Sequence, residues 1–123
     1  MVFKLSRKSQ ERLETCDERL ITIVHDVCKV MDITVLCGHR GEEEQEKAFK
    51  EGKSRAHFGQ SYHNASPSLA VDIAPYPINW DVKDPRWEIM CNLVLYIANK
   101  YRIKVKLGRD FTNLKDYPHI EIV

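Results

Sequence analysis

The sequence has no excess of charge of one sign. Its 123 residues include 19 Lys and Arg against 18 Asp and Glu, which gives a formal net charge of +1 at pH 7. Proteins that bind nucleic acid or membrane surfaces through bulk charge carry a clear excess of basic residues. The balance therefore argues against nucleic acid as a partner, and the length indicates one domain able to bury a core.

Long hydrophobic runs are missing as well. No stretch approaches the roughly 18 consecutive apolar residues that span a bilayer. The N-terminal residues 1–8 become polar too early for a signal peptide. We therefore expect no integral membrane segment, and a chain that is cytoplasmic when it is synthesised.

Paired cysteine motifs are also lacking, because the four cysteines at positions 16, 28, 37 and 91 include no Cys-x-x-Cys. This spacing argues against a structural zinc site built from cysteines. Cys16 and Cys28 are predicted to share one helix, which would place them roughly 18 Å apart. That separation is too large for a disulfide, and we expect all four thiols to be reduced.

Hydrophobic periodicity predicts an α+β fold, with about three helices packed on a small, mostly antiparallel sheet. Helices are expected from Ser6 or Ser9 to about Met31, over 42–51 and over 86–101. Strands are expected over 33–37, 69–74, 103–107 and 120–123. The polar segment 53–67 has no predicted regular structure, and so long a segment in a small domain is typically functional.

Two segments carry side chains suited to one metal ion. The first holds His63 and, after eight intervening residues, Asp72; the second holds Asp116 and His119. Two imidazoles and a carboxylate are a common ligand set for catalytic zinc, which leaves its fourth position to water. Asp116 is then a spare carboxylate that could serve as the base. The site requires that His63 turn toward Asp72 and His119.

More ordinary interpretations exist for each of these residues. Asp72 lies in an apolar run, where an ionised carboxylate needs a cation or a paired side chain, and a salt bridge to Arg40 or Arg55 would also satisfy it. His63 could be a solvated loop residue and His119 a hydrogen-bonded structural one.

A nucleophilic triad of Ser61, His63 and Asp72 is the alternative from another class of enzyme. Ser61 stands two residues from His63 in a loop and lacks a surrounding Gly-x-Ser-x-Gly. This arrangement does not fit the roles that a triad requires. Ser61 is better suited to hydrogen-bond the loop or to support the metal ligands.

Further candidates surround these residues. Arg40 follows a predicted buried strand, and its guanidinium could bind a carboxylate or a developing oxyanion. His57 lies in the polar loop and could face substrate, and Trp80 lies in a later loop. Glu121 should face the same side of a strand as His119, because it is two residues away, which makes it a rival to Asp116 as the base.

Three sequence motifs together resemble those of one enzyme superfamily. They are Ser61-x-His63 leading to Pro67-Ser68-Leu69-Ala70-Val71-Asp72, then Asp116-Tyr117-Pro118-His119-Ile120-Glu121, and Gly38-His39-Arg40-Gly41-Glu42-Glu43-Glu44-Gln45. Together they resemble the zinc peptidases of the D-alanyl-D-alanine carboxypeptidase and L-alanyl-D-glutamate endopeptidase superfamily, in particular the phage-borne endopeptidases (endolysins). The similarity runs from about Thr34 to the C-terminus and leaves the helix within 1–33 outside.

The resemblance implies one Zn²⁺ per chain, bound by His63, Asp72 and His119. It implies that Asp116 is the catalytic base and that Arg40 holds the polarised carbonyl or a substrate carboxylate. Supporting or substrate-binding roles are expected for five further side chains: Ser61, Gln45, Glu121, His57 and Trp80.

The resemblance also implies a single catalytic domain over 1–123 that acts as a monomer. Its substrate would be bacterial peptidoglycan, cleaved between L-alanine and D-glutamate of the stem peptide by a phage lysin that reaches the wall after its release. A D-alanyl-D-alanine carboxypeptidase or dipeptidase is one alternative. An inactive zinc-binding module that recognises cell wall is the other, although the chain retains Asp116 and Glu121, which such a module would be expected to lack.

Overall fold

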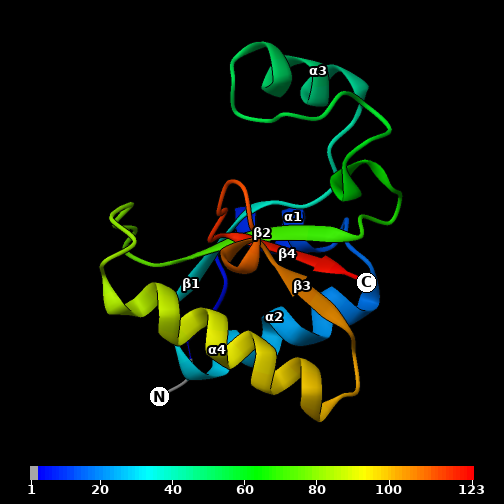
Figure 1. Ribbon diagram of the computed structural model, residues 1–123. Helices are drawn as coiled ribbons and strands as arrows, with labels where there is room; N and C mark the ends of the chain where they lie inside the picture. Colours follow the sequence, from blue (N-terminus) through cyan, green and yellow to red (C-terminus); the bar gives the residue numbers. More distant parts are fainter. Residues whose placement is uncertain (1–2) are drawn as a thin grey trace.

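The computed structural model describes residues 3–123, so Met1 and Val2 of the N-terminal segment considered above lie outside the described residues. The elements in chain order are α1 (Arg7–Leu13), α2 (Glu18–Val30), β1 (Ile33–Cys37), α3 (Glu42–Lys50), η1 (Tyr62–Asn64), β2 (Ala70–Pro75), α4 (Pro85–Lys100), β3 (Val105–Leu107), η2 (Gly108–Asp110) and β4 (His119–Ile122). The strands form one antiparallel sheet in the order β1-β2-β4-β3 (Figure 1). The predicted α+β fold is confirmed.

The single helix expected from Ser6 or Ser9 to about Met31 is wrong, because the chain bends between α1 and α2. Asp17 begins α2 by accepting a hydrogen bond from the backbone N–H of Arg19 at 2.9 Å. The bend, residues 14–17, is held from outside: the N–H of Asp17 donates to the carbonyl of Ser68, and the N–H of Ser68 donates to the carbonyl of Thr15, both at 2.9 Å. The periodicity of the apolar residues hid this break, since both helices bury residues at similar steps.

The division of that helix raises the helix count from about three to four within residues 3–123. It also removes the reasoning that placed Cys16 and Cys28 on one straight helix. All four cysteines are nevertheless free in the structure, as expected.

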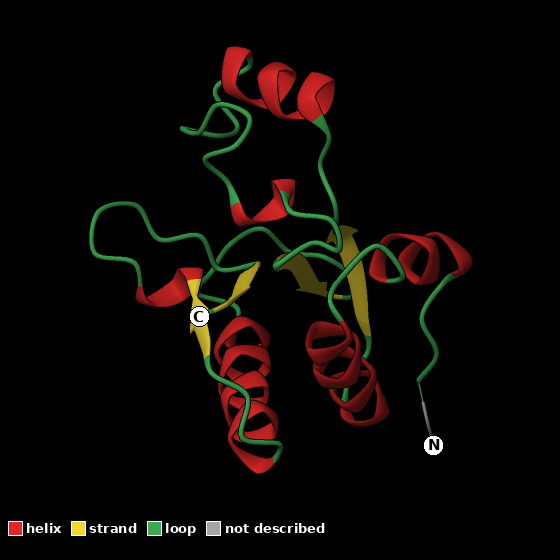
Figure 2. Ribbon diagram, turned by 90° about the vertical axis from the view of Figure 1, so that its right-hand side faces the viewer, coloured by secondary structure: helices red, strands yellow, loops and turns green. Residues whose placement is uncertain are grey.

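Helices α2 and α4 pack side by side against one face of the sheet, as Figure 2 shows. The core between them contains apolar side chains from both helices and the strands, among them Leu20, Ile23, Val27, Trp87, Met90, Val94, Val71, Ile73 and Ile120. Successive side chains of a strand point to opposite faces. Because Val71, Ile73, Ile120 and Ile122 are buried in this core, the intervening Asp72 and the neighbours of Ile120 project from the other face.

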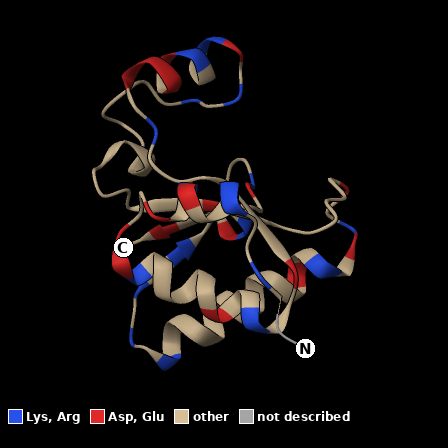
Figure 3. Ribbon diagram, turned by 180° about the vertical axis from the view of Figure 1, so that it is seen from behind, with Lys and Arg blue, Asp and Glu red and all other residues tan. Residues whose placement is uncertain are grey.

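That other face lies beneath α3 and the loop that follows it, which stand apart from α2 and α4 in both views. Gln45 is the one buried residue of α3. Acidic and basic residues are both distributed over the helices (Figure 3), in keeping with the balanced composition. In the part of the chain that is described, no helix is both long and apolar enough to cross a membrane.

Candidate active site

Asp72 lies at the centre of a row of side chains that crosses three strands. In the sheet register it is paired with Cys37 of β1 on one side and with His119 of β4 on the other. His63 comes from η1, which is begun by Ser61, whose hydroxyl accepts a hydrogen bond from the N–H of His63 at 3.2 Å. Three strands and one short helix thus bring four side chains that can bind a metal to one place.

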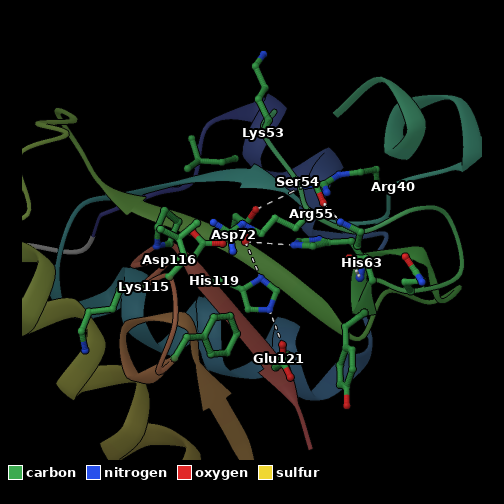
Figure 4. A pocket seen from close by; sticks show the side chains of 18 of the residues that line it. Arg40, Lys53, Ser54, Arg55, His63, Asp72, Lys115, Asp116, His119 and Glu121 are labelled. Atoms are coloured by element: carbon green, nitrogen blue, oxygen red, sulfur yellow. Dashed lines mark hydrogen bonds and ion pairs between the residues drawn. The ribbon is translucent and has the colours of Figure 1, made fainter. Parts of the chain in front are cut away.

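Both histidines turn toward the same carboxylate oxygen (Figure 4). His63 Nε2 and His119 Nδ1 each lie 3.2 Å from Asp72 Oδ1. The two imidazole rings meet edge to face, with centroids 5.2 Å apart. The structure therefore meets the requirement that His63 face Asp72 despite the eight-residue interval, whereas the role of these residues as ligands stays a prediction.

The outer nitrogen of each ring has its own partner. His63 Nδ1 lies 2.7 Å from the carbonyl oxygen of Gly38, and His119 Nε2 lies 2.7 Å from Glu121 Oε1. Because a carbonyl and a carboxylate both accept, each outer nitrogen carries a proton. Metal-binding histidines have this arrangement, which fixes the ring and directs the other nitrogen at the ion. Glu121 therefore lies behind His119 rather than in position to act as a base.

Charges and hydrogen bonds among Asp72, His63 and His119 shift the pKa of each side chain. Burial by itself raises the pKa of Asp72, but the hydrogen bonds and charges of His119 and His63 hold that pKa well below its ordinary value. Burial lowers the pKa of His63, yet the hydrogen bonds and charges of Asp72 and Cys37 together outweigh this and raise the pKa to about 10. The pKa of His119 is raised in the same way, against its burial.

These residues fit a divalent cation. A buried carboxylate needs compensating positive charge, which here comes either from protons on two imidazoles or from an ion in their place. Donor atoms within 4.8 Å of one another form two sets that share Asp72: Cys37, His63 and Asp72, and Asp72, Asp116 and His119. Imidazole, carboxylate and thiolate are the ligands zinc prefers.

Asp116 is held beside this cluster by the turn at η2. Its N–H donates to the carbonyl of Gly108 at 2.9 Å, and the N–H of His119 donates to the Asp116 carbonyl at 3.1 Å. Gly108 packs so closely on this loop that an added Cβ would collide with the Asp116 carbonyl and lie 2.9 Å from the Cβ of His119. The side chain reaches the cleft, and desolvation by the cleft walls together with the charge of Asp72 raises the pKa of Asp116, against the lowering effect of His119, His63 and Arg40.

Arg40 reaches the cluster from the loop between β1 and α3. Its Nη2 lies 4.0 Å from Asp72 Oδ2, so Arg40 rather than Arg55 is the arginine beside Asp72. Nη1 donates to Gln45 Oε1 at 3.1 Å, and the Arg40 N–H donates to the His63 carbonyl at 2.7 Å. The same Gln45 oxygen accepts from Asn64 at 3.1 Å. Gln45 thus supports Arg40 from behind and does not reach the cleft.

An open cleft of about 960 Å³ runs over the cluster. Aromatic and cationic side chains line its walls: Tyr62, Trp80, Phe111, Lys53, Arg55 and Lys115. Ser61 and Trp80 also line the cleft, and their supporting or substrate-binding roles stay predictions. His57 does not line the cleft, because it is stacked on Phe49 at 3.8 Å and paired with Glu46 at 2.9 Å on the exposed side of α3.

Sequence reasoning gave no metal role to Cys37 and no cleft role to Lys53 or Lys115. The cysteine reaches the site through an irregularity in strand pairing between Val35 and Cys37, for which the sequence offers no clear signal. The lysines lie in polar loops, where a basic residue carries no spatial information by itself.

Comparisons with known proteins identify the family and the fold. The model of the family described as phage L-alanyl-D-glutamate peptidase matches residues 1–123. The peptidoglycan L-alanyl-D-glutamate endopeptidase CwlK of Bacillus subtilis (strain 168) is 28% identical over 107 residues, which cover 77% of this chain and 63% of CwlK. The chain therefore spans less than two thirds of that relative. The crystal structure of the Serratia marcescens L-Ala D-Glu endopeptidase ChiX shares the fold, with a TM-score of 0.82 and 21% identity over 98% of this chain and 90% of ChiX.

Proposed function

Because the chain belongs to the phage L-alanyl-D-glutamate peptidase family, we propose that it is a zinc-dependent endopeptidase. It hydrolyses the bond between L-alanine and D-glutamate in the stem peptides of bacterial peptidoglycan. The observation that carries the proposal is the approach of His63 Nε2 and His119 Nδ1 to one oxygen of Asp72, each at 3.2 Å. One Zn²⁺ per monomeric chain is held there, and the biological role is that of a phage lysin.

Each residue of the site has a separate role in the reaction. His63, Asp72 and His119 would hold the zinc ion, which when bound would polarise the carbonyl group and make a water more acidic. Asp116 removes a proton from the water that attacks the L-alanine carbonyl carbon. Arg40 binds the carbonyl oxygen as negative charge develops on it. The carbon–nitrogen bond then breaks, and Asp116 returns the proton to the departing amine of D-glutamate.

The raised pKa of Asp116 suits this task, because a general base works best when its pKa lies near the pH of the reaction. Glu121 is less suited, since its carboxylate is engaged with His119 at 2.7 Å. Substitutions distinguish the base, Asp116, from Glu121, which supports His119. Glu121→Gln should weaken zinc binding by about 10- to 100-fold, whereas Asp116→Asn should leave zinc bound.

The walls of the cleft suit a peptide that carries carboxylates. Lys53 and Arg55 follow α3 on one side, and Lys115 lies on the other (Figure 4). Two carboxylates of the cluster are already engaged, Asp72 with two histidines and Glu121 with one. Lys53 is paired with Glu51 at 3.3 Å. The glutamate of the substrate would therefore pair best with Arg55, because a guanidinium can bind a carboxylate through two parallel hydrogen bonds.

Mass spectrometry of digested muropeptides tests the proposal. We expect new fragments that begin with D-glutamate, from a protein that metal analysis finds to hold about one zinc per chain. Chelation should abolish these fragments, and added Zn²⁺ should restore them. Released D-alanine would instead identify a carboxypeptidase, and cleavage by metal-free protein would overturn the zinc mechanism.

A further inference from the structure

Cys37 is directed at the cluster by a β-bulge. Val35 is paired with Ile73, and both are buried in the core. Regular alternation would place Cys37 on the same core face as Val35, two residues earlier. The register shifts between them, however, so that Cys37 is paired with Asp72. Bulges re-aim side chains in this way, often beside active sites.

The thiol lies near two of the proposed metal ligands, His63 and Asp72. Its sulfur, one nitrogen of His63 and one oxygen of Asp72 all lie within 4.8 Å of one another. Two ligands of a tetrahedral zinc ion are about 3.5 Å apart for bonds of the usual length, so shifts on the order of 1 Å would bring all three onto one ion. Arg40 Nη2 lies 3.6 Å from the same sulfur.

Cys37 also differs from the other cysteines. Cys16, Cys28 and Cys91 are buried in the core, whereas Cys37 is partly exposed. The sulfur of Cys37 has a weak acceptor of its own, the Gly38 carbonyl at 3.5 Å. Of the four cysteines, Cys37 is the one that is grouped with candidate metal ligands.

We propose that Cys37 is a fourth protein ligand, recruited when a soft divalent ion such as Cd²⁺ occupies the site. Thiolate selects soft ions, whereas imidazole and carboxylate alone do not. With Cys37, His63, Asp72 and His119 all bound, the coordination sphere is closed, as in structural rather than catalytic zinc sites. The inference rests on the proposed metal site, and it adds that soft ions bind tightly and in a form that excludes water.

Spectroscopy of the full chain tests this ligand directly. Cadmium-loaded wild-type protein should show a sulfur-to-metal charge-transfer band in the ultraviolet. Cys37→Ser should lack the band and bind Cd²⁺ at least about tenfold more weakly, since even partners outside the ligand set account for 10- to 100-fold. Cys91→Ser, which removes a thiol on α4, is the matched control and should keep both.

A second measurement needs no variant. Iodoacetamide labelling of native protein, mapped by mass spectrometry, should modify Cys37 first, and Cd²⁺ should protect it. A cadmium-loaded protein that shows no charge-transfer band, and whose Cys37 is labelled at the same rate with and without Cd²⁺, would overturn the inference; cleavage of stem peptides by the zinc-loaded protein would leave the proposed function standing. A zinc-loaded protein that does not cleave would overturn the proposed function, whereas a cadmium band would still support the inference.

Discussion

Replacing Gln45 with methionine should destabilise the protein and displace Arg40 without touching a metal ligand. Gln45 is fully buried, and its amide makes four hydrogen bonds. Nε2 donates to Ser54 Oγ at 2.9 Å and to the Ala56 carbonyl at 2.6 Å. Oε1 accepts from Arg40 and from Asn64, each at 3.1 Å. Methionine is close to glutamine in volume, so the change removes hydrogen bonds with little loss of packing.

The expected loss of stability depends on which hydrogen bonds the partners of Gln45 retain after the substitution. Ser54 Oγ still accepts from the N–H of Ala56, and Asn64 still donates to the Arg40 carbonyl. The Ala56 carbonyl and Arg40 Nη1 lose the Gln45 amide. A buried group left without a partner costs about 1–3 kcal/mol, so we expect a loss of about 2–4 kcal/mol. For a domain of this size that is a fall in Tm of roughly 8–16 °C, at about 4 °C per kcal/mol.

Urea unfolding and steady-state kinetics measure the two consequences separately. Beyond the stability loss, kcat should fall, by up to about 100-fold if Arg40 moves by an ångström, while zinc content stays unchanged. Gln10→Met on α1 is the matched control and should alter neither quantity. Gln45→Glu keeps the oxygen that accepts from Arg40 and should therefore lose stability but retain more activity. A Gln45→Met protein with wild-type stability and kcat would refute the supporting role of this amide.

Three further predictions concern the cluster and the loop beside it. Asp116→Asn should reduce kcat by about 10²- to 10⁴-fold with zinc retained by metal analysis; near-normal turnover would remove Asp116 from the base role. In metal-free protein, the stability contributed by His63 is fully present below its unfolded pKa of 6.5 and is lost as pH rises through its folded pKa of about 10. The folded pKa of Asp72 is lowered, so its contribution to stability is present above its unfolded pKa of 3.8 and is lost as pH falls. The urea concentration at the unfolding midpoint should therefore be highest between about pH 4 and 6.5. A midpoint that rises from pH 6.5 to 10 would contradict this. Gly108→Ala should lower both Tm and activity because its Cβ collides with the Asp116 loop, whereas Gly41→Ala, whose Cβ would meet nothing closer than 3.8 Å, should behave like wild type in the same melting and cleavage assays.

The sheet and the position of the cluster could be predicted because their signals are local. Asp72 could be singled out because it is a carboxylate within the apolar run of β2, and the two-residue spacing in β4 indicated that Glu121 faces the same side as His119. The motifs around His63 and His119 then indicated which histidines to join to Asp72. Spacing alone could not supply the distances, which depend on how η1 packs over β2.

The remainder depends on contacts between distant segments. The bend between α1 and α2 forms where Ser68 pairs with the backbone of residues 15 and 17, and only Asp17, a good first residue for a helix, hinted at it. The bulge before Cys37 depends on the pairing partner in β2. His57 could not be assigned from its loop, because its stacking on Phe49 arises from how the loop folds back on α3.

The bend between α1 and α2 bears on the order in which the protein folds. Its pairing with Ser68 joins residues about fifty positions apart, and Gly38 packs against Arg12 and Thr15 of the same region. Contacts of such long range are costly in chain entropy and tend to form late. Ser68, at the end of the loop that carries His63, is therefore expected to reach its native position only after α1 and α2 have docked. Mutations in the bend should then slow the assembly of the site, although the bend lies outside it.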